Sequence, residues 1–280
     1  MIKRFLLAAA AVSLTACGGG GGGTSSGPTG PVAVATDTTR LRGAALVMEA
    51  GTLERALIAG EYNASNVSGS IRFTHNRGID ITDANGLDGA GNLTNGTVTL
   101  AALSKPSSVQ WAFPYVRTVD MAGNPQWGVG VYGARPLAKY VATSGSANYA
   151  GTATLFDMGA ATPNSQANGT SNLSVDFGAQ SATLDIRTTG GAIAGVDHIS
   201  FPDLSMRGGS DLGRNSTLFS TNGQAFLGGS PATALGTIAR TNARAHFYGD
   251  VSAEGVPDEV GGAVLIEGSS GTISGVFVAD

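Results

Sequence analysis

The chain has 280 residues, of which 43 are glycine, 6% are aromatic and 13% carry a charge. Each glycine inside a helix costs about 1 kcal/mol relative to alanine, so this composition disfavours long helices and suits short strands joined by tight turns. The formal net charge of −4 gives no basic surface of the kind that nucleic-acid binding needs, and we expect no nucleic-acid partner.

Residues 1–16 have the parts of a secretion signal peptide. Lys3 and Arg4 supply a positive start, an apolar run follows, and Leu14–Cys17 (Leu-Thr-Ala-Cys) supplies a cleavage site. The apolar run is too short to span a bilayer. The tetrapeptide resembles a bacterial lipobox, which implies cleavage before Cys17 and attachment of fatty acyl chains such as palmitate to that cysteine. An ordinary secreted protein with one spare cysteine is the alternative interpretation.

Cys17 is the only cysteine, so the chain can form neither an internal disulfide nor a thiol metal site. Acyl chains on this residue would hold the protein at a membrane, because each buried methylene contributes about 0.8 kcal/mol. Residues 17–39 are rich in glycine, serine and proline and cannot bury enough apolar surface to fold. We therefore interpret 17–39 as a flexible tether.

Residues 40–140 give mixed strand signals, which we interpret as a smaller β-rich domain. Leu41–Gly60 is ambiguous because part of it has helical propensity, and we favour strands there. Alternation of apolar and polar residues around Ile71–Phe73 indicates a strand. A turn at 121–125, between an aromatic-rich segment and Trp127–Tyr132, indicates a hairpin. The boundary of this domain is expected near 136–145.

Glycines at 128, 130 and 133 have the spacing of a dinucleotide-binding loop. That chemistry requires a helix whose N-terminus faces pyrophosphate, whereas Arg135 and Pro136 follow here and no amphipathic helical pattern is present. A glycine-rich strand is the favoured interpretation.

The C-terminal half has the most regular pattern. Apolar Leu173, Val175 and Phe177 alternate with polar residues, and 182–186 repeats this after a turn, which predicts a hairpin with one face in water. Further candidate strands cover Tyr149–Phe156, Ile199–Met206, Ser216–Ser220, Gln224–Leu227, Arg244–Tyr248, Gly262–Glu267 and Thr272–Val278. Nine candidates at regular spacing favour a closed barrel or a sandwich, since closure removes exposed sheet edges.

Several motifs between 145 and 280 resemble the barrel of transferrin-binding protein B and its relatives. An aromatic-Tyr-Gly strand, a Glu-x-Gly-Gly turn and a Gly-Val-Phe strand follow one another at Ala245–Gly249, Glu259–Gly262 and Gly275–Phe277. Asn148–Ala153 and Val175–Gly178 are similar to the strand that opens this barrel and to its recurrent Val-Asp-Phe-Gly step. The resemblance implies an all-β, antiparallel fold, with an eight-stranded β-barrel over 141–280 preceded by a smaller β-rich, handle-like domain over 40–140.

Two departures from the family pattern weaken any transfer of a specific ligand. The chain ends Phe277-Val278-Ala279-Asp280 where the family often ends in Phe-Gly-Ala and a basic residue, and Val264 stands where an aromatic residue is common. The matching motifs are also structural, because glycine permits sharp backbone bends and phenylalanine fills a barrel interior. They therefore indicate a barrel and name no ligand.

The resemblance also carries an expectation about function. It implies a monomeric surface lipoprotein, anchored to the outer membrane through Cys17, that captures a host protein or a nutrient or iron carrier and passes its cargo to an outer-membrane receptor. A haem or other small-ligand carrier, with His75 or His246 as ligand, is one alternative, and a structural or adhesive surface lipoprotein is another. An integral outer-membrane barrel is disfavoured because the chain is poor in aromatic residues and ends in Asp280.

No sequence pattern predicts catalysis or a bound cofactor. The chain has no Gly-x-Ser-x-Gly elbow, no His-Glu-x-x-His motif and no Walker loop, and we expect it not to be an enzyme. His75, His198 and His246 are too far apart in sequence to form a local metal motif. Oxygen-bearing side chains gather between Asp80 and Asp88, with Asp83 and Asn85 between them, but their spacing is not that of a calcium loop and turn chemistry is the favoured interpretation.

Overall fold

The computed structural model describes residues 38–49, 52–63, 68–75, 80–85, 93–94, 99–100, 111–119, 125–133, 135–136, 141–158, 163–209 and 213–280. Every regular element among these residues is a β-strand, and the paired strands run antiparallel. This confirms the all-β prediction. The signal peptide, Cys17 and the tether lie outside the described residues, as does Asp88.

The N-terminal part forms a six-stranded sheet with the strand order β4-β3-β2-β1-β8-β7. Leu41–Gly60, the ambiguous segment, lies in two strands that pair without interruption from Thr38–Asn63 to Glu49–Thr52, so the choice of strands is confirmed. The predicted hairpin is β7 with β8. The strands are β1 (Thr38–Glu49), β2 (Thr52–Asn63), β3 (Ser68–His75), β4 (Asp80–Asn85), β7 (Trp111–Val119) and β8 (Pro125–Gly133), while β5 (Leu93–Thr94) and β6 (Thr99–Leu100) pair only with each other.

The glycine-rich motif at 128–133 lies inside β8, which is hydrogen-bonded to β1 on one side and β7 on the other. The motif is therefore a strand, as favoured, and it does not form the loop that a dinucleotide would need. The interpretation of Asp83 and Asn85 as turn residues is wrong, because both belong to β4. Asp83 pairs with Arg72 and Asn85 with Ser70, so pairing with β3 overrides the turn propensity of these residues.

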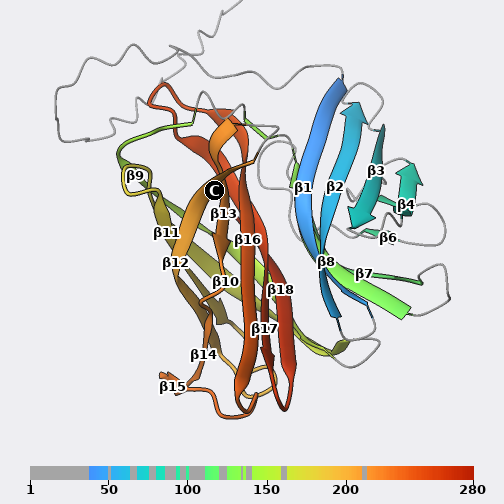
Figure 1. Ribbon diagram of the computed structural model, residues 1–280, viewed down its shortest axis with the longest axis vertical. Helices are drawn as coiled ribbons and strands as arrows, with labels where there is room; N and C mark the ends of the chain where they lie inside the picture. The colour runs from blue at the N-terminus through green and yellow to red at the C-terminus, as the bar shows by residue number, and fades with distance from the viewer. Residues whose placement is uncertain are drawn as a thin grey trace, which may run out of the picture.

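The C-terminal part forms a closed barrel of eight antiparallel strands (Figure 1). The ring closes because β9 pairs with β18, and because β11 pairs with β12. One of the nine candidate strands lies outside this ring. It is β14 (Gln224–Leu227), which pairs with one end of β12 and with the short β15 (Ser230–Pro231). The barrel strands are β9 (Ser146–Met158), β10 (Pro163–Asp176), β11 (Ser181–Thr188), β12 (His198–Gly209), β13 (Gly213–Ser220), β16 (Ile238–Val251), β17 (Pro257–Gly268) and β18 (Thr272–Ala279).

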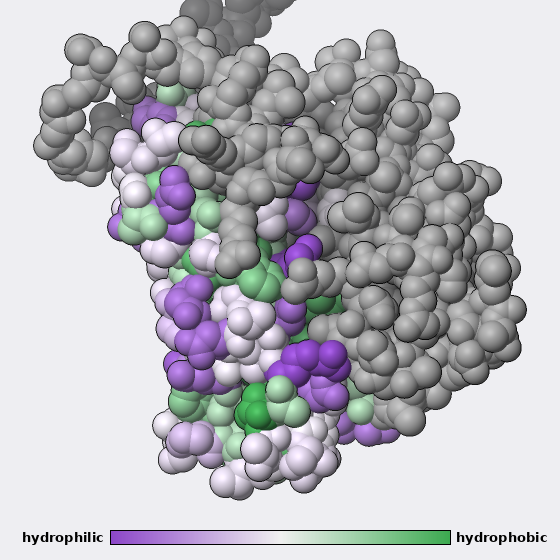
Figure 2. Space-filling view, in the orientation of Figure 1, coloured by the Kyte–Doolittle hydropathy of each residue, from purple (hydrophilic) through white to green (hydrophobic). Residues whose placement is uncertain are grey.

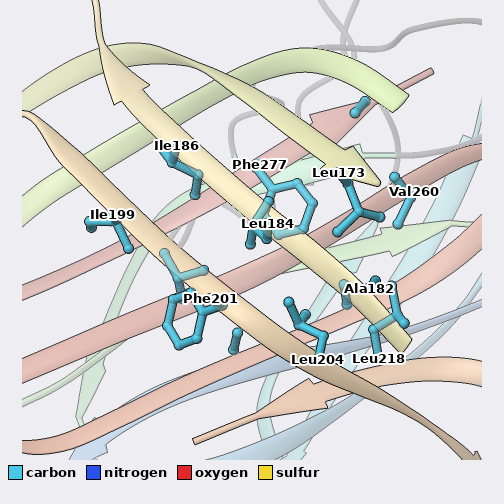
Figure 3. Packing of buried hydrophobic residues seen from close by; sticks show 14 of the residues in the cluster. Leu173, Ala182, Leu184, Ile186, Ile199, Phe201, Leu204, Leu218, Val260 and Phe277 are labelled. Atoms are coloured by element: carbon cyan, nitrogen blue, oxygen red, sulfur yellow. The ribbon is translucent and has the colours of Figure 1, made fainter. Parts of the chain in front are cut away.

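Large apolar side chains fill the barrel interior (Figure 3). Leu184, Phe201 and Phe277 are fully buried there, and they come from three different strands. The predicted alternation holds in β11, where inward residues are buried and their neighbours are more exposed. Buried Val141 and Leu235 belong to the same core and come from segments outside the strands, so these segments help to close the barrel.

Adjacent residues of β10 test the alternation. Leu173 is 1% exposed and points into the barrel, whereas Asn172 is exposed on the outer face. We expect Leu173→Ala to lower the free energy of unfolding by about 2–5 kcal/mol, because it leaves a cavity in a packed core. Asn172→Ala should change it by no more than about 0.5 kcal/mol. Urea denaturation of both variants makes the comparison, and equal effects would contradict the register.

Candidate functional site

The outward faces of the strands β16, β17 and β18 form a second buried surface. Ala263, Leu265, Val276 and Val278 point away from the barrel interior, yet each is at most 2% exposed. They belong to an apolar cluster that also contains residues of β1 and β8, namely Leu46, Val129 and Val131. The six-stranded sheet therefore packs against the outer wall of the barrel, as Figure 1 shows beside β16–β18.

Two glycines of the motifs noted in the sequence allow the barrel strands to approach closely. A Cβ at Gly262 would lie 2.3 Å from the backbone oxygen of Arg244, and one at Gly275 would lie 2.6 Å from that of Thr154. Any other residue at these positions would push neighbouring strands apart. The motifs are thus explained by barrel geometry and carry no ligand chemistry of their own.

Tyr248 makes a polar contact across this interface. Its ring is fully buried, and its hydroxyl donates a hydrogen bond to the backbone oxygen of Val131 at 3.3 Å. Burial raises the pKa of the Tyr248 phenol, and the nearby positive charge of Arg135 opposes this shift. The neutral phenol therefore suits this site, where it holds barrel and sheet together.

A separate short chain of hydrogen bonds lies beside Tyr248 on the outer wall of the barrel. Arg135 Nη2 donates to Thr217 Oγ1 at 3.3 Å, and Thr217 Oγ1 lies 3.2 Å from Nδ1 of His246. Since the threonine oxygen accepts from the guanidinium, its own proton is available to the imidazole nitrogen. The His246 ring is 6% exposed and stands edge-on to Tyr248. This histidine lies outside the barrel interior, within the interface.

The described histidines occupy separate surroundings. His198 Nε2 lies 2.7 Å from Asp185 Oδ1, and its ring stacks on Phe226, whereas His246 pairs with Thr217. His75 ends β3, and its side chain lies outside the described residues. Within the described part of the chain, no group of three or more His, Cys, Asp or Glu side chains is arranged to hold a metal ion.

Fold and interface together define a class of all-β protein, in which a filled eight-stranded antiparallel barrel carries a six-stranded sheet on its outer wall. No helix in the described ranges is long and apolar enough to cross a bilayer. No family model and no curated protein matches the sequence.

Solved structures similar to this one include transferrin-binding proteins B and a surface lipoprotein. Intact transferrin-binding protein B, with its N and C lobes, is 9% identical over 91% of this chain and 79% of its own, at a TM-score of 0.39. A double mutant of transferrin-binding protein B, a vaccine antigen from Haemophilus parasuis, is 9% identical over 91% and 78%, at 0.38. The surface lipoprotein is 14% identical over 85% and 98%, at 0.40.

These structures include the protein that the C-terminal motifs resemble. Because the TM-scores lie below 0.5 and the identities do not exceed 14%, the matches carry no argument about function, and they assign no family to the chain.

Because two tyrosines are buried, we expect the protein to lose stability at alkaline pH. Burial raises the pKa of Tyr248 and also that of Tyr149, whose hydroxyl donates to the backbone oxygen of Pro257 at 2.9 Å. A raised pKa means that the folded state binds more protons than the unfolded state once the pH exceeds the ordinary value of 10.0. The stabilisation is therefore complete below that pH and is lost as the pH rises above it.

We expect the free energy of unfolding of the wild type to fall more steeply above pH 10 than that of a Tyr149→Phe, Tyr248→Phe double variant. At pH 7 each single substitution should cost about 0.5–1.5 kcal/mol through its lost hydrogen bond. Denaturant unfolding between pH 7 and 11 measures both effects. If the free energies of unfolding of the wild type and the double variant changed in parallel with pH, the two tyrosines would not be the cause of the alkaline loss of stability.

Proposed function

We propose that the protein is a lipid-anchored binding protein of the outer-membrane surface that captures a host protein or a nutrient or iron carrier. In this proposal Cys17 carries the acyl chains, residues 17–39 form the tether, and residues 40–140 and 141–280 are the two domains. Support comes from the lipobox, the low-complexity segment behind it and the barrel motifs. Passing the cargo to an outer-membrane receptor belongs to the same proposal.

The filled barrel is the observation that decides how such a protein would bind. Its interior holds large buried side chains from all eight strands. Buried hydroxyls described on inward positions, those of Ser171 and Thr241, donate to backbone oxygens of the barrel. A partner would therefore be contacted by the outer surface and the loops, where a few side chains supply most of the affinity. An exterior site of this kind suits a macromolecular partner better than a small molecule.

The haem-carrier alternative gains no support at His246. The residue is 6% exposed, and its Nδ1 lies 3.2 Å from Thr217 Oγ1, so neither its burial nor this hydrogen bond suits a haem ligand. A role for His75 stays a prediction. The adhesive alternative uses the same outer surface and differs only in the partner, which would be an envelope or cell-surface component.

The anchor is tested by replacing Cys17 with alanine. Acyl chains on that cysteine would account for membrane attachment, so we expect Cys17→Ala to abolish incorporation of labelled palmitate and to remove the protein from the outer-membrane fraction. Ser26→Ala in the tether is the matched control and should leave both unchanged. Wild-type protein without acyl groups in its native host, determined by intact mass, would refute this part.

Surface capture is tested on intact cells. External protease should remove the wild-type protein while a periplasmic marker stays intact, and affinity capture from host serum should return one enriched protein that mass spectrometry identifies. Complete protection from protease would refute surface display. Recovery of envelope components alone would overturn the host-protein proposal in favour of the adhesive one.

A further inference from the structure

The loop between β13 and β14 contains an Asn-Gly pair, Asn222 followed by Gly223. Asparagine before glycine is especially prone to deamidation, because glycine places no side chain in the way when its backbone nitrogen attacks the asparagine side chain. Further Asn-Gly pairs lie at 85–86, 95–96 and 168–169. The pair at 168–169 lies wholly within the described part of the chain and serves as an internal comparison.

The comparison pair is fixed inside a strand. Gly169 of β10 pairs with Ala153 of β9 on one side and with Thr188 of β11 on the other, so its backbone is held in extended form. Cyclisation at Asn168 would require the strand to leave the barrel. Asn168 and Asn222 are both exposed, and the described barrel surface in Figure 2 is mostly hydrophilic or neutral, so water reaches such positions.

The loop at Asn222 is held by side chains instead. The Gly223 N–H donates to Thr241 Oγ1 at 2.8 Å, and Asn222 Nδ2 donates to Asp203 Oδ2 at 3.0 Å. Asp203 Oδ1 accepts a further bond from Ser220 Oγ at 2.8 Å. The backbone–backbone bonds of the described residues include none from the loop itself. A segment held in this way opens locally at a lower free energy than a strand paired on both sides.

The same two side-chain contacts keep the reacting atoms apart while the loop is closed. Cyclisation joins the Gly223 nitrogen to Asn222 Cγ, so the carboxamide must turn away from Asp203 and the N–H must leave Thr241. Thr241 is 7% exposed, and its hydroxyl also donates to the backbone oxygen of Thr221, so the acceptor for Gly223 is fixed in place. Reaction therefore requires the loop to open first.

We propose that Asn222 is a site of spontaneous deamidation that reacts when this loop opens, and that the product keeps the loop open. The Gly223 nitrogen attacks Asn222 Cγ, and the carboxamide nitrogen leaves as ammonia with the proton of the Gly223 N–H, which leaves a cyclic imide. Water then opens the imide to aspartate or isoaspartate. The new carboxylate faces Asp203 where Nδ2 had donated, and two carboxylates at that distance repel each other. A brief opening thereby becomes a lasting one.

The reaction is followed in the full chain, purified in detergent and incubated at physiological pH and temperature. Peptide mapping by mass spectrometry measures aspartate and isoaspartate at positions 168 and 222. We expect deamidation of the folded wild type to be several-fold faster at 222 than at 168. In urea-unfolded chain the two rates should be similar, because the local sequence alone decides them. Equal rates in the folded chain, or a faster rate at 168, would overturn the proposal.

Thr241 offers a matched pair of variants. Thr241→Val removes the acceptor for Gly223 with little change of shape, whereas Thr241→Ser keeps the hydroxyl. We expect Thr241→Val to raise the rate at 222 by about fivefold, which is the effect on an opening equilibrium of losing one typical hydrogen bond. Thr241→Ser should stay close to the wild type. An unchanged rate at 222 in Thr241→Val, or an equal rise at 168 through general unfolding, would contradict the proposal.

Hydrogen exchange of the Gly223 amide tests whether the product holds the loop open. Asn222→Asp reproduces the new carboxylate and should speed this exchange. Adding Asp203→Asn to it should restore slow exchange, because amide and carboxylate then stand in exchanged positions. Asn172→Asp adds the same charge on exposed β10 and should have no effect. Unchanged exchange in Asn222→Asp, or no recovery with Asp203→Asn, would refute this part. These readouts do not involve capture of a host protein, so this inference and the proposed function can fail separately.

Discussion

The whole arrangement depends on two adjacent strands, β17 and β18, that bury apolar side chains on both faces. Their inward residues belong to the barrel core, and their outward residues pack against the N-terminal sheet. The neighbouring strand β16 adds Tyr248 to this interface, and the Tyr248 hydroxyl donates to the backbone oxygen of Val131. Such burial of a polar group is tolerated because the bond replaces the water that is lost. One set of strands thereby stabilises both parts of the molecule.

A second consequence concerns where chemistry can occur. Filling the barrel with side chains removes the internal cavity that larger or emptier barrels offer to small ligands. The polar chain from Arg135 through Thr217 to His246 lies in the interface and orients two packed surfaces, with no access for a diffusing substrate at the 6% exposed histidine. What is left for recognition is the exterior of the molecule.

The strands that could be predicted from the sequence are those with one face exposed to solvent. Alternation in 172–186 was visible because each inward residue has an exposed neighbour, and the barrel followed from the spacing of such segments together with the family resemblance. The outward apolar surface of β17 and β18 was not visible, because a strand buried on both faces has no alternation to detect. Tyr248 and Val131, which share a hydrogen bond, stand 117 positions apart in the sequence, and no local pattern links them. Asp83 and Asn85 show the same limit, since pairing with β3 decides their structure.

Closure of the ring makes the barrel dependent on its last strand. β18, residues 272–279, pairs with β9 at the other end of the barrel sequence and with β17 before it. Hairpins of neighbouring strands can form in turn as the chain is made, but the cylinder cannot close until residues 272–279 are available to pair with β9. Closure is therefore a long-range event that local hairpin formation cannot replace.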